Sequence, residues 1–402
     1  MELSDSVLDH LRSVAALPDL SGTRYELEGE IGRGGMGIVF LAEKDNEGVK
    51  DYIVLKSIKT LSEEHENRLR KEANIATSLR HENIVKTYGL ESIPFHSLPE
   101  SFVKELQGLS FNRSKIHLNQ YSPIARVMGT AFYNKKIMIE HAKFDAANSG
   151  KKLFLIAMDY IHGTDLRILH WRHRKRSLLI PCPLSGFIIS RICRALNYAH
   201  QYIVHRDISP ENILINEQGV CKLTDFGVAA TNEEEMKLFA GKLDYMSPEQ
   251  IKQQAMDART DIFALGLVAY EITTGICIYE TPPNLSFDEQ KDYIVRKMDM
   301  GIIPPHKVCP DVSEKLSQII MKMLIKDKDK RFQSMPEVGD ALEQKYIYAH
   351  GFGPTNNSLA AYLEIFNNEF KQYTQEQLRQ LNFLKNQDGK VALTRHAVNQ
   401  AL

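Results

Sequence analysis

Residues 204–214 read Val-His-Arg-Asp-Ile-Ser-Pro-Glu-Asn-Ile-Leu, and residues 225–227 read Asp-Phe-Gly. Asn212 follows Asp207 by five residues, and Asp225 comes within the length of one short hairpin. This spacing predicts two adjacent loops that carry a carboxylate able to orient an attacking hydroxyl and two oxygen ligands for Mg²⁺. Phosphoryl transfer needs these parts, because its transition state asks for positioning and charge neutralisation rather than covalent chemistry. Asp207 is the candidate base, and Asn212 and Asp225 are the candidate metal ligands.

The composition is that of an ordinary globular protein. The 402 residues are 43% hydrophobic, and 50 basic side chains nearly balance 51 acidic ones, so no global field would recruit nucleic acid or an anionic membrane. The five cysteines show no CxxC spacing, which favours buried free thiols in a reducing compartment. No apolar run approaches the ~18 residues of a membrane span. Glu2 and Asp5 occupy the start of the chain, where a secretory signal would be basic. We therefore expect a cytoplasmic protein.

The hydrophobic periodicity predicts a small β-rich part followed by a larger helical part. From Tyr25 the period is two across three segments, which predicts antiparallel strands that end near Leu55. Further strands are expected at 84–91 and 152–161, with an insertion at about 92–151 between them. Helices are expected at 4–17, 62–79, 184–201 and 260–274, and in the tail along Leu359, Tyr362, Leu363, Phe366 and Phe370, with a capping box at Thr374 and Gln377. The expected fold class is α+β.

A glycine-rich turn joins the first two predicted strands. Gly32, Gly34 and Gly37 supply the spacing G-x-G-x-x-G, and the missing side chains would let backbone N–H groups approach phosphates. A dinucleotide-binding turn has the same spacing, but it requires a helix directly after the third glycine. Here Val39-Phe40-Leu41 continues as a strand, which favours a flap over a nucleotide.

Lys56 and Glu72 form the next candidate pair. Lys56 ends the third strand, where an ammonium group can bridge two phosphates; the alternative is an ordinary lysine at a strand edge. Glu72 lies on the inward face of the 62–79 helix, with Leu69 and Ala76. A carboxylate on that face requires a cationic partner, and Lys56 is the candidate.

Together these motifs resemble the eukaryotic-type (Hanks) Ser/Thr protein kinase family over about residues 25–345. The resemblance implies a two-lobed fold: an N-terminal helical extension (1–24), a β-rich N-lobe with one regulatory helix (25–161), a helical C-lobe (162–345) and a C-terminal helical extension (346–402). It implies ATP with Mg²⁺, or Mn²⁺ as an alternative, and protein substrates. It further implies an activating ion pair between Lys56 and Glu72.

The resemblance also assigns the nucleotide contacts. Gly32, Gly34 and Gly37 would cover ATP; Ile31, Val39, Val54 and Leu214 would line its site; Met158 would be the gatekeeper, Asp159 to Ile161 the adenine hinge, and Asp165 the ribose contact. In the second lobe, Ser247-Pro248-Glu249 matches the docking-segment motif, Glu249 should pair with Arg331, and Asp261 opens the buried helix that should support the catalytic loop around Asp207.

Two positions depart from the family pattern. Ser209 stands where the family usually has lysine, and Lys242 stands where it usually has threonine. In the family those side chains touch each other beside the base, so the lysine is expected to have moved across the site. The sequence motifs that carry this exchange are similar to those of bacterial kinases, especially kinases of myxobacterial type.

Three alternatives stay open. The chain could be a pseudokinase scaffold that binds partners without turnover, although its catalytic residues are intact. It could transfer AMP instead of phosphate within the same fold. The basic stretch Arg167–Arg176 is interpreted as a solvated helix face, with a dock for an acidic substrate or partner as the rival.

Overall fold

The computed structural model describes residues 24–34, 37–46, 49–58, 63–94, 152–226, 240–282 and 285–367. The predicted helix at 4–17, residues 95–151 of the predicted insertion, and the tail beyond Asn367 with Phe370 and the Thr374 capping box lie outside these ranges. The chain divides into two compact units. The first holds the described residues up to Ser78 and Lys86–Tyr160; the second holds Leu79–Val85 and, apart from Ala240, the described residues from Ile161 onward.

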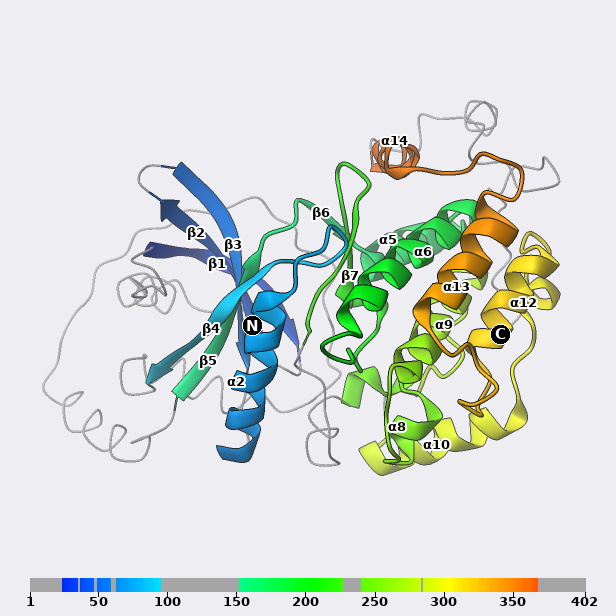
Figure 1. Ribbon diagram of the computed structural model, residues 1–402, viewed down its shortest axis with the longest axis horizontal. Coiled ribbons are helices and arrows are strands. Elements are labelled where there is room, and N and C mark those ends of the chain that lie inside the picture. The colour runs from blue at the N-terminus through cyan, green and yellow to red at the C-terminus, as the bar shows by residue number, and fades with distance from the viewer. Residues whose placement is uncertain are drawn as a thin grey trace, which may run out of the picture. The chain divides into compact units, whose positions relative to one another are not determined.

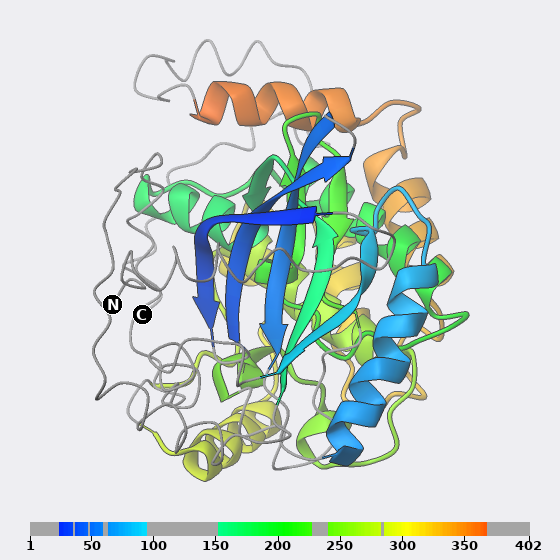
Figure 2. The same ribbon diagram turned by 90° about the vertical axis from the view of Figure 1, so that its left-hand side faces the viewer.

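The first unit is built on a five-stranded antiparallel sheet (Figure 2). Its strands, in spatial order, are β1 (Arg24–Gly34), β2 (Gly37–Asn46), β3 (Val49–Ile58), β5 (Lys152–Asp159) and β4 (Thr87–Pro94). Phe40 and Ala42 on β2 and Ile53 and Leu55 on β3 are buried with period two, as a strand with one face on the core requires. The three predicted N-terminal strands are therefore confirmed.

Helix α2 (Glu63–Ser78) packs against β4 in the same unit. Its buried residues Leu69, Ala73 and Ala76 recur at helical spacing, and the guanidinium of Arg70 lies 5.1 Å from the centre of the Phe154 ring on β5. The predicted helix at 62–79 is confirmed.

The predicted bounds of β4 are wrong by about three residues at each end. The strand begins at Thr87 and continues to Pro94, which pairs with Lys152 of β5. Ile84 instead forms a parallel bridge with Leu223 in the second unit. Periodicity could not show this, because the bounds depend on pairing with a partner strand some sixty residues away in the chain.

The second unit is helical around two buried helices, α6 (Cys182–Ala199) and α9 (Arg259–Thr274). Every residue of α9 from Thr260 to Thr274 is buried, and the helix ends at Gly275 in the left-handed conformation. The surrounding helices are α5 (Leu166–Lys175), α8 (Pro248–Ile251), α10 (Phe287–Met300), α11 (Pro305–Val308), α12 (Glu314–Met323), α13 (Met335–Leu342) and α14 (Asn356–Asn367). Short helices of other types are η2 (Pro210–Asn212), η3 (Ala240–Tyr245) and η4 (Glu343–Ile347).

A short antiparallel sheet lies next to the loop of Asp207 in the chain. Its strands are β6 (Gly163–Asp165), β7 (Ile213–Asn216) and β8 (Cys221–Leu223), paired in that order. The two units together have the predicted α+β composition, with a sheet-based first unit and a helical second one (Figure 1).

The predicted tail helix is present as α14, and it is part of the core of the second unit. Leu359, Tyr362 and Phe366 are fully buried. The ring of Phe366 stacks on His173 of α5 with centroids 3.9 Å apart. Nδ1 of His173 lies 2.7 Å from the carbonyl of Leu169, so Nε2 accepts the hydrogen bond from the Tyr362 hydroxyl at 2.5 Å. In Figure 1, α14 lies above α5.

The cysteines fit the interpretation as unpaired thiols. All five are free, and Cys182, Cys193, Cys221 and Cys309 are buried. Burial raises the pKa of the Cys221 thiol to about 12, so it stays protonated near neutral pH. Across the ranges given above, no helix has the length and apolar character needed to cross a membrane.

Candidate active site

The loop between α6 and β7 holds Asp207 in a fixed orientation. Asp207 is buried, and its neighbour in the loop, Asn212, is buried with it. The side-chain amide nitrogen of Asn212 donates to the backbone carbonyl of Asp207 at 2.7 Å and to its carboxylate Oδ2 at 2.9 Å. Because one amide group is hydrogen-bonded to both the backbone and the carboxylate of Asp207, this side chain is oriented before any substrate binds.

Asp261, at the start of α9, supports this loop through its side chain, whereas the sequence had predicted support only from the buried helix. Its fully buried carboxylate accepts hydrogen bonds from the amides of His205 (2.8 Å) and Arg206 (2.7 Å) and lies 2.8 Å from Nε2 of His200. Burial alone would raise the pKa of Asp261, but the contacts with His200 and His205 outweigh it and the pKa lies below its usual range. The carboxylate is therefore charged at neutral pH.

The backbone of Arg206 needs that support. Its φ of +63° is in the left-handed region, which costs a non-glycine residue on the order of 1 kcal/mol. The carbonyl of Arg206 also accepts a hydrogen bond from the side chain of Gln250 at 2.8 Å. Contacts on both sides thus hold a strained residue directly before Asp207.

The loop that carries Asp225 is bound to the catalytic loop. The Thr224 amide donates to the carbonyl of Asn212 at 3.0 Å, and Nε2 of His205 lies 2.8 Å from the Thr224 carbonyl. The Phe226 ring meets His205 edge-on, 4.6 Å between centroids. Asp225 itself has φ of +68°. The two predicted metal ligands, Asn212 and Asp225, therefore lie on loops joined by hydrogen bonds, as their spacing predicted.

The pairing predicted between Glu249 and Arg331 is present. The guanidinium of Arg331 donates to both carboxylate oxygens of Glu249, at 2.9 and 3.2 Å, and Thr260 donates to Oε1 at 3.1 Å. Burial would raise the pKa of Glu249, but the hydrogen bond and charge of Arg331 hold it below its usual range. Ser247 caps α8 in a reciprocal box with Gln250, the residue that holds Arg206. The docking segment and the catalytic loop thus form one network.

A second network, which is partly buried, was not predicted. Arg167 of α5 donates to Glu211 at 2.9 Å and to Glu271 of α9 at 2.6 Å. The Tyr245 hydroxyl joins it through hydrogen bonds with both Arg167 and Glu271. This cluster connects four separate elements: α5, η2, η3 and α9.

The interpretation of Arg167–Arg176 as a solvated face is therefore wrong for its inner half. Arg167, His170 and His173 recur every three residues and turn inward, whereas Arg174 and Lys175 are exposed. Burial lowers the pKa of both His170 and His173 to about 3, so these rings are neutral. The three-residue spacing was a usable signal, because such residues share a helix face.

Two predicted nucleotide residues of the second unit pair with each other. Asp165 on β6 lies opposite Leu214 on β7. Asp165 is also the N-cap of α5, where its carboxylate accepts a hydrogen bond from the amide of Ile168 at 2.7 Å. Burial, aided by the charge of Glu211, outweighs this hydrogen bond and raises the pKa of Asp165 to about 6.

Four of the predicted nucleotide residues of the first unit, Val39, Val54, Lys56 and Met158, share one face of its sheet. Val39 pairs with Lys56, and Val54 pairs with Met158; paired residues, and residues two apart on a strand, point to the same face. Phe154 has the same parity, so α2, through Arg70, packs on this face as well. Lys56 is 9% exposed and Glu72 is half-buried on α2.

The other predicted residues are placed only in part. Gly32 pairs with Val39, and Gly34 pairs with Gly37, across the β1–β2 turn. The two central residues of this turn lie outside the described ranges, and the structure does not describe the side chain of Ile31. Lys242 lies in η3, but its side chain is likewise not described. The hydroxyl of Ser209 is buried and has no hydrogen-bond partner among the residues that are described.

The family model and the relatives that match this chain are all protein kinases. The protein kinase domain family matches residues 135–347, somewhat more than half of the chain. The serine/threonine-protein kinase PknB of Mycolicibacterium smegmatis is 33% identical over 191 residues, 46% of this chain and 29% of PknB. The tyrosine-protein kinase MasK of Myxococcus xanthus is 30% identical over 226 residues, 52% of this chain and 34% of MasK.

A plant relative covers more of both chains. The serine/threonine-protein kinase Aurora-2 of Arabidopsis thaliana is 26% identical over 324 residues, 79% of this chain and 89% of Aurora-2. The chain spans only about a third of the length of the two bacterial relatives.

Proposed function

This chain belongs to the protein kinase family, and we propose that it transfers the γ-phosphoryl group of ATP to serine and threonine hydroxyls of proteins in a signalling role. One observation carries the proposal most directly: Asn212 grips the Asp207 carboxylate, and the same loop is bonded to the loop of Asp225. A base and two oxygen ligands are thereby held by one network, the arrangement that in-line phosphoryl transfer uses.

Asp207 would accept the proton of the substrate hydroxyl as that oxygen attacks phosphorus. Asn212 and Asp225 would hold a divalent cation, Mg²⁺ with Mn²⁺ as the alternative. Their amide and carboxylate oxygens suit a hard cation, which takes its remaining ligands from phosphates and water. The amide nitrogen of Asn212 is bound to Asp207, which directs the amide oxygen to a different side. When bound, the cation neutralises charge on the phosphates.

The remaining predicted contacts belong to the same proposal. Lys56 would bind the phosphates and pair with Glu72, Gly32, Gly34 and Gly37 would cover them, and Asp165 would bind the ribose. The shared sheet face of Lys56, Val54 and Met158 supports a nucleotide surface in the first unit. The boundaries proposed for the two lobes are 25–161 and 162–345.

Lys242 is proposed to take the role of the lysine that the family usually has at the position of Ser209. The buried Ser209 hydroxyl, two residues after Asp207, supports an exchange of roles: a hydroxyl on the catalytic loop and an ammonium from the docking segment. Buried free thiols and balanced charge support a cytoplasmic enzyme that acts on proteins rather than nucleic acid.

The direct test is to incubate the purified chain with Mg-ATP and casein and to map modified residues by mass spectrometry. Phosphoserine and phosphothreonine on casein or on the chain itself are expected. An added adenylyl group would instead establish AMP transfer. ATP binding without any modification would establish the pseudokinase alternative, and phosphotyrosine alone would overturn the proposed acceptor class.

A further inference from the structure

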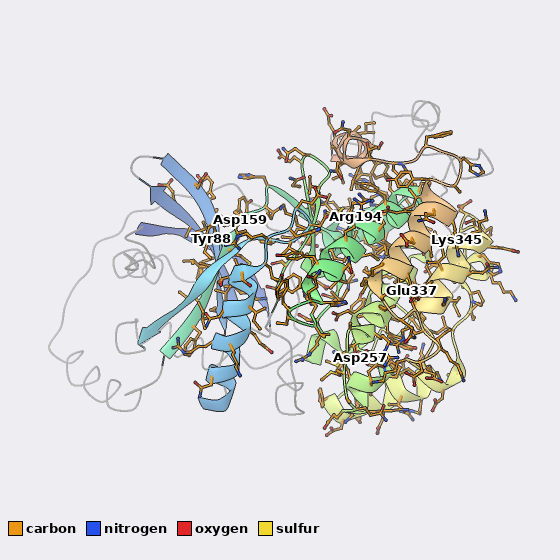
Figure 3. All side chains as sticks on the ribbon, viewed as in Figure 1. Tyr88, Asp159, Arg194, Asp257, Glu337 and Lys345 are labelled. Carbon is orange, nitrogen blue, oxygen red and sulfur yellow. The ribbon has the colours of Figure 1, made fainter. Side chains whose placement is uncertain are left out.

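Tyr88 interrupts the regular pairing between β4 and β5. Thr87 lies opposite Met158 and Gly89 lies opposite Ala157, so Tyr88 is an extra residue in a β-bulge. Bulges re-aim side chains, often beside functional sites. Here the Tyr88 hydroxyl donates to Oδ1 of Asp159 at 2.6 Å, a short hydrogen bond to a carboxylate. Figure 3 shows Tyr88 and Asp159 next to each other.

Asp159 is thereby attached at three points. Its carboxylate accepts the Tyr88 hydrogen bond, its amide donates to the carbonyl of Lys86 at 2.9 Å, and it pairs with Ile53 of β3. Asp159 is also the last residue of β5. The ammonium of Lys86 lies 4.5 Å from the centre of the Tyr88 ring, so the bulge braces its own tyrosine. The chain leaves the first unit one residue later, after Tyr160.

The hydrogen bond lies on the face of the sheet opposite Lys56. Asp159 pairs with Ile53, whereas the proposed nucleotide face carries Val54, Lys56 and Met158, whose positions have the other parity. The Tyr88 hydroxyl therefore cannot reach a nucleotide on that face. Through its bond to Asp159 it would instead act on the backbone of the strand end.

We propose that Tyr88 is a positioning residue for the adenine base: through the Asp159 carboxylate it fixes the backbone segment Asp159–Ile161 that would read the purine edge. The inference rests on the proposed function, because it presumes that adenine binds this segment. The Asp159 amide already donates to Lys86, so the purine would be bound by the other backbone groups of the segment. Those groups are aimed correctly only if the strand end is held.

The test is Tyr88→Phe in the full chain, which removes one oxygen and keeps the ring. The dissociation constant of the Mg²⁺ complex of a non-hydrolysable ATP analogue is measured by calorimetry, alongside KM and kcat. Loss of a hydrogen bond to a charged acceptor is expected to raise Kd and KM for the nucleotide about fivefold to twentyfold, with kcat little changed. Tyr202→Phe is the matched control, since Tyr202 is 54% exposed and lies in the second unit.

Substitutions at Asp159 separate positioning from general damage to the fold. Asp159→Asn keeps an oxygen that can accept the Tyr88 hydrogen bond, so its Kd should be lower than that of Asp159→Ala, which should bind as weakly as Tyr88→Phe. The double variant should be no weaker than Asp159→Ala, because the two changes remove one interaction. Thermal melts confirm that each variant is folded.

A Tyr88→Phe variant that binds the analogue within about twofold of wild type would overturn the inference. So would additive losses in the double variant, or a loss confined to kcat. If wild type binds the analogue but transfers no phosphate, the proposed function fails while Kd still decides the role of Tyr88. If wild type binds no nucleotide, both fail.

Discussion

Asp165 combines two roles that its burial sets against each other. As the N-cap of α5 it needs only an oxygen acceptor, whereas a ribose contact benefits from a charged carboxylate. Burial makes that charge costly and raises the pKa to about 6. A group with a raised folded-state pKa contributes stability that is full below its unfolded value and is lost as pH rises through the folded value. At pH 8 the charged Asp165 therefore destabilises the fold.

Asp165→Asn should accordingly stabilise the protein at pH 8, because asparagine caps helices as well as aspartate and carries no charge. The upward pKa shift corresponds to roughly 1–3 kcal/mol in the free energy of unfolding. Urea denaturation at pH 8 and pH 5.5 measures it, and the gain should shrink at the lower pH. The same variant should bind ATP more weakly. A variant less stable than wild type at pH 8 would show that the charged Asp165 carboxylate does not destabilise the folded protein.

Lys242→Ala should lower kcat by on the order of 10², the cost of removing a cation placed at developing phosphate charge. Lys252→Ala, at the exposed end of α8, is the matched control and should be nearly silent. Partial recovery of kcat by Ser209→Lys in the Lys242→Thr background would support the exchange of roles. A kinetically silent Lys242→Ala with saturating Mg-ATP would reject it.

At the scale of elements, the packing of α14 on the β7–β8 turn extends the folded second unit to this helix. Gly219, in the β7–β8 turn, has φ of +74°, and a Cβ there would lie 2.0 Å from the carbonyl oxygen of Asn356 in the first turn of α14. Such an approach cannot be relieved by rotating a side chain, because the Asn356 oxygen is a backbone atom and the position of a Cβ is fixed by the backbone of residue 219. The helix and the turn must therefore separate if Gly219 gains a side chain.

Gly219→Ala should destabilise the protein by about 3 kcal/mol or more, because it combines backbone strain with a collision. Gly301→Ala is the matched control: its φ is +82°, but nothing lies within 4 Å of a Cβ there, so backbone strain alone should cost roughly 1–3 kcal/mol, less than strain and collision together. Urea unfolding compares the two free energies. Equal losses would mean that α14 does not dock on this turn in solution.

Elements and their supports differ in how well the sequence predicts them. The strands of the first unit and helices α2, α6 and α9 follow from local periodicity, which a single segment carries. The Arg167 network does not, because its partners Tyr245 and Glu271 are 78 and 104 residues away in the chain. The bulge at Tyr88 is similarly hidden, since it exists only in the register between two strands.

For the whole molecule, the order of motifs predicted the two-part α+β architecture and the residues of the catalytic loops. The groups that hold those residues came only from the structure: Gln250 on the Arg206 carbonyl, and the Thr224 amide on Asn212. Catalytic residues are recognisable because chemistry restricts their type and spacing. Their supports are hydrogen bonds that many residue types can make, so spacing alone does not reveal them.

The central claim is that Asp207 is the base of a phosphoryl-transfer site, and one comparison tests it most directly. Wild type and Asp207→Asn are given labelled Mg-ATP and casein, and phosphate transfer and ATP binding are measured on the same preparations. Transfer should fall by a factor of about 10²–10⁴, while the dissociation constant for ATP stays close to that of wild type. An Asp207→Asn enzyme that transfers phosphate at nearly the wild-type rate would contradict the account.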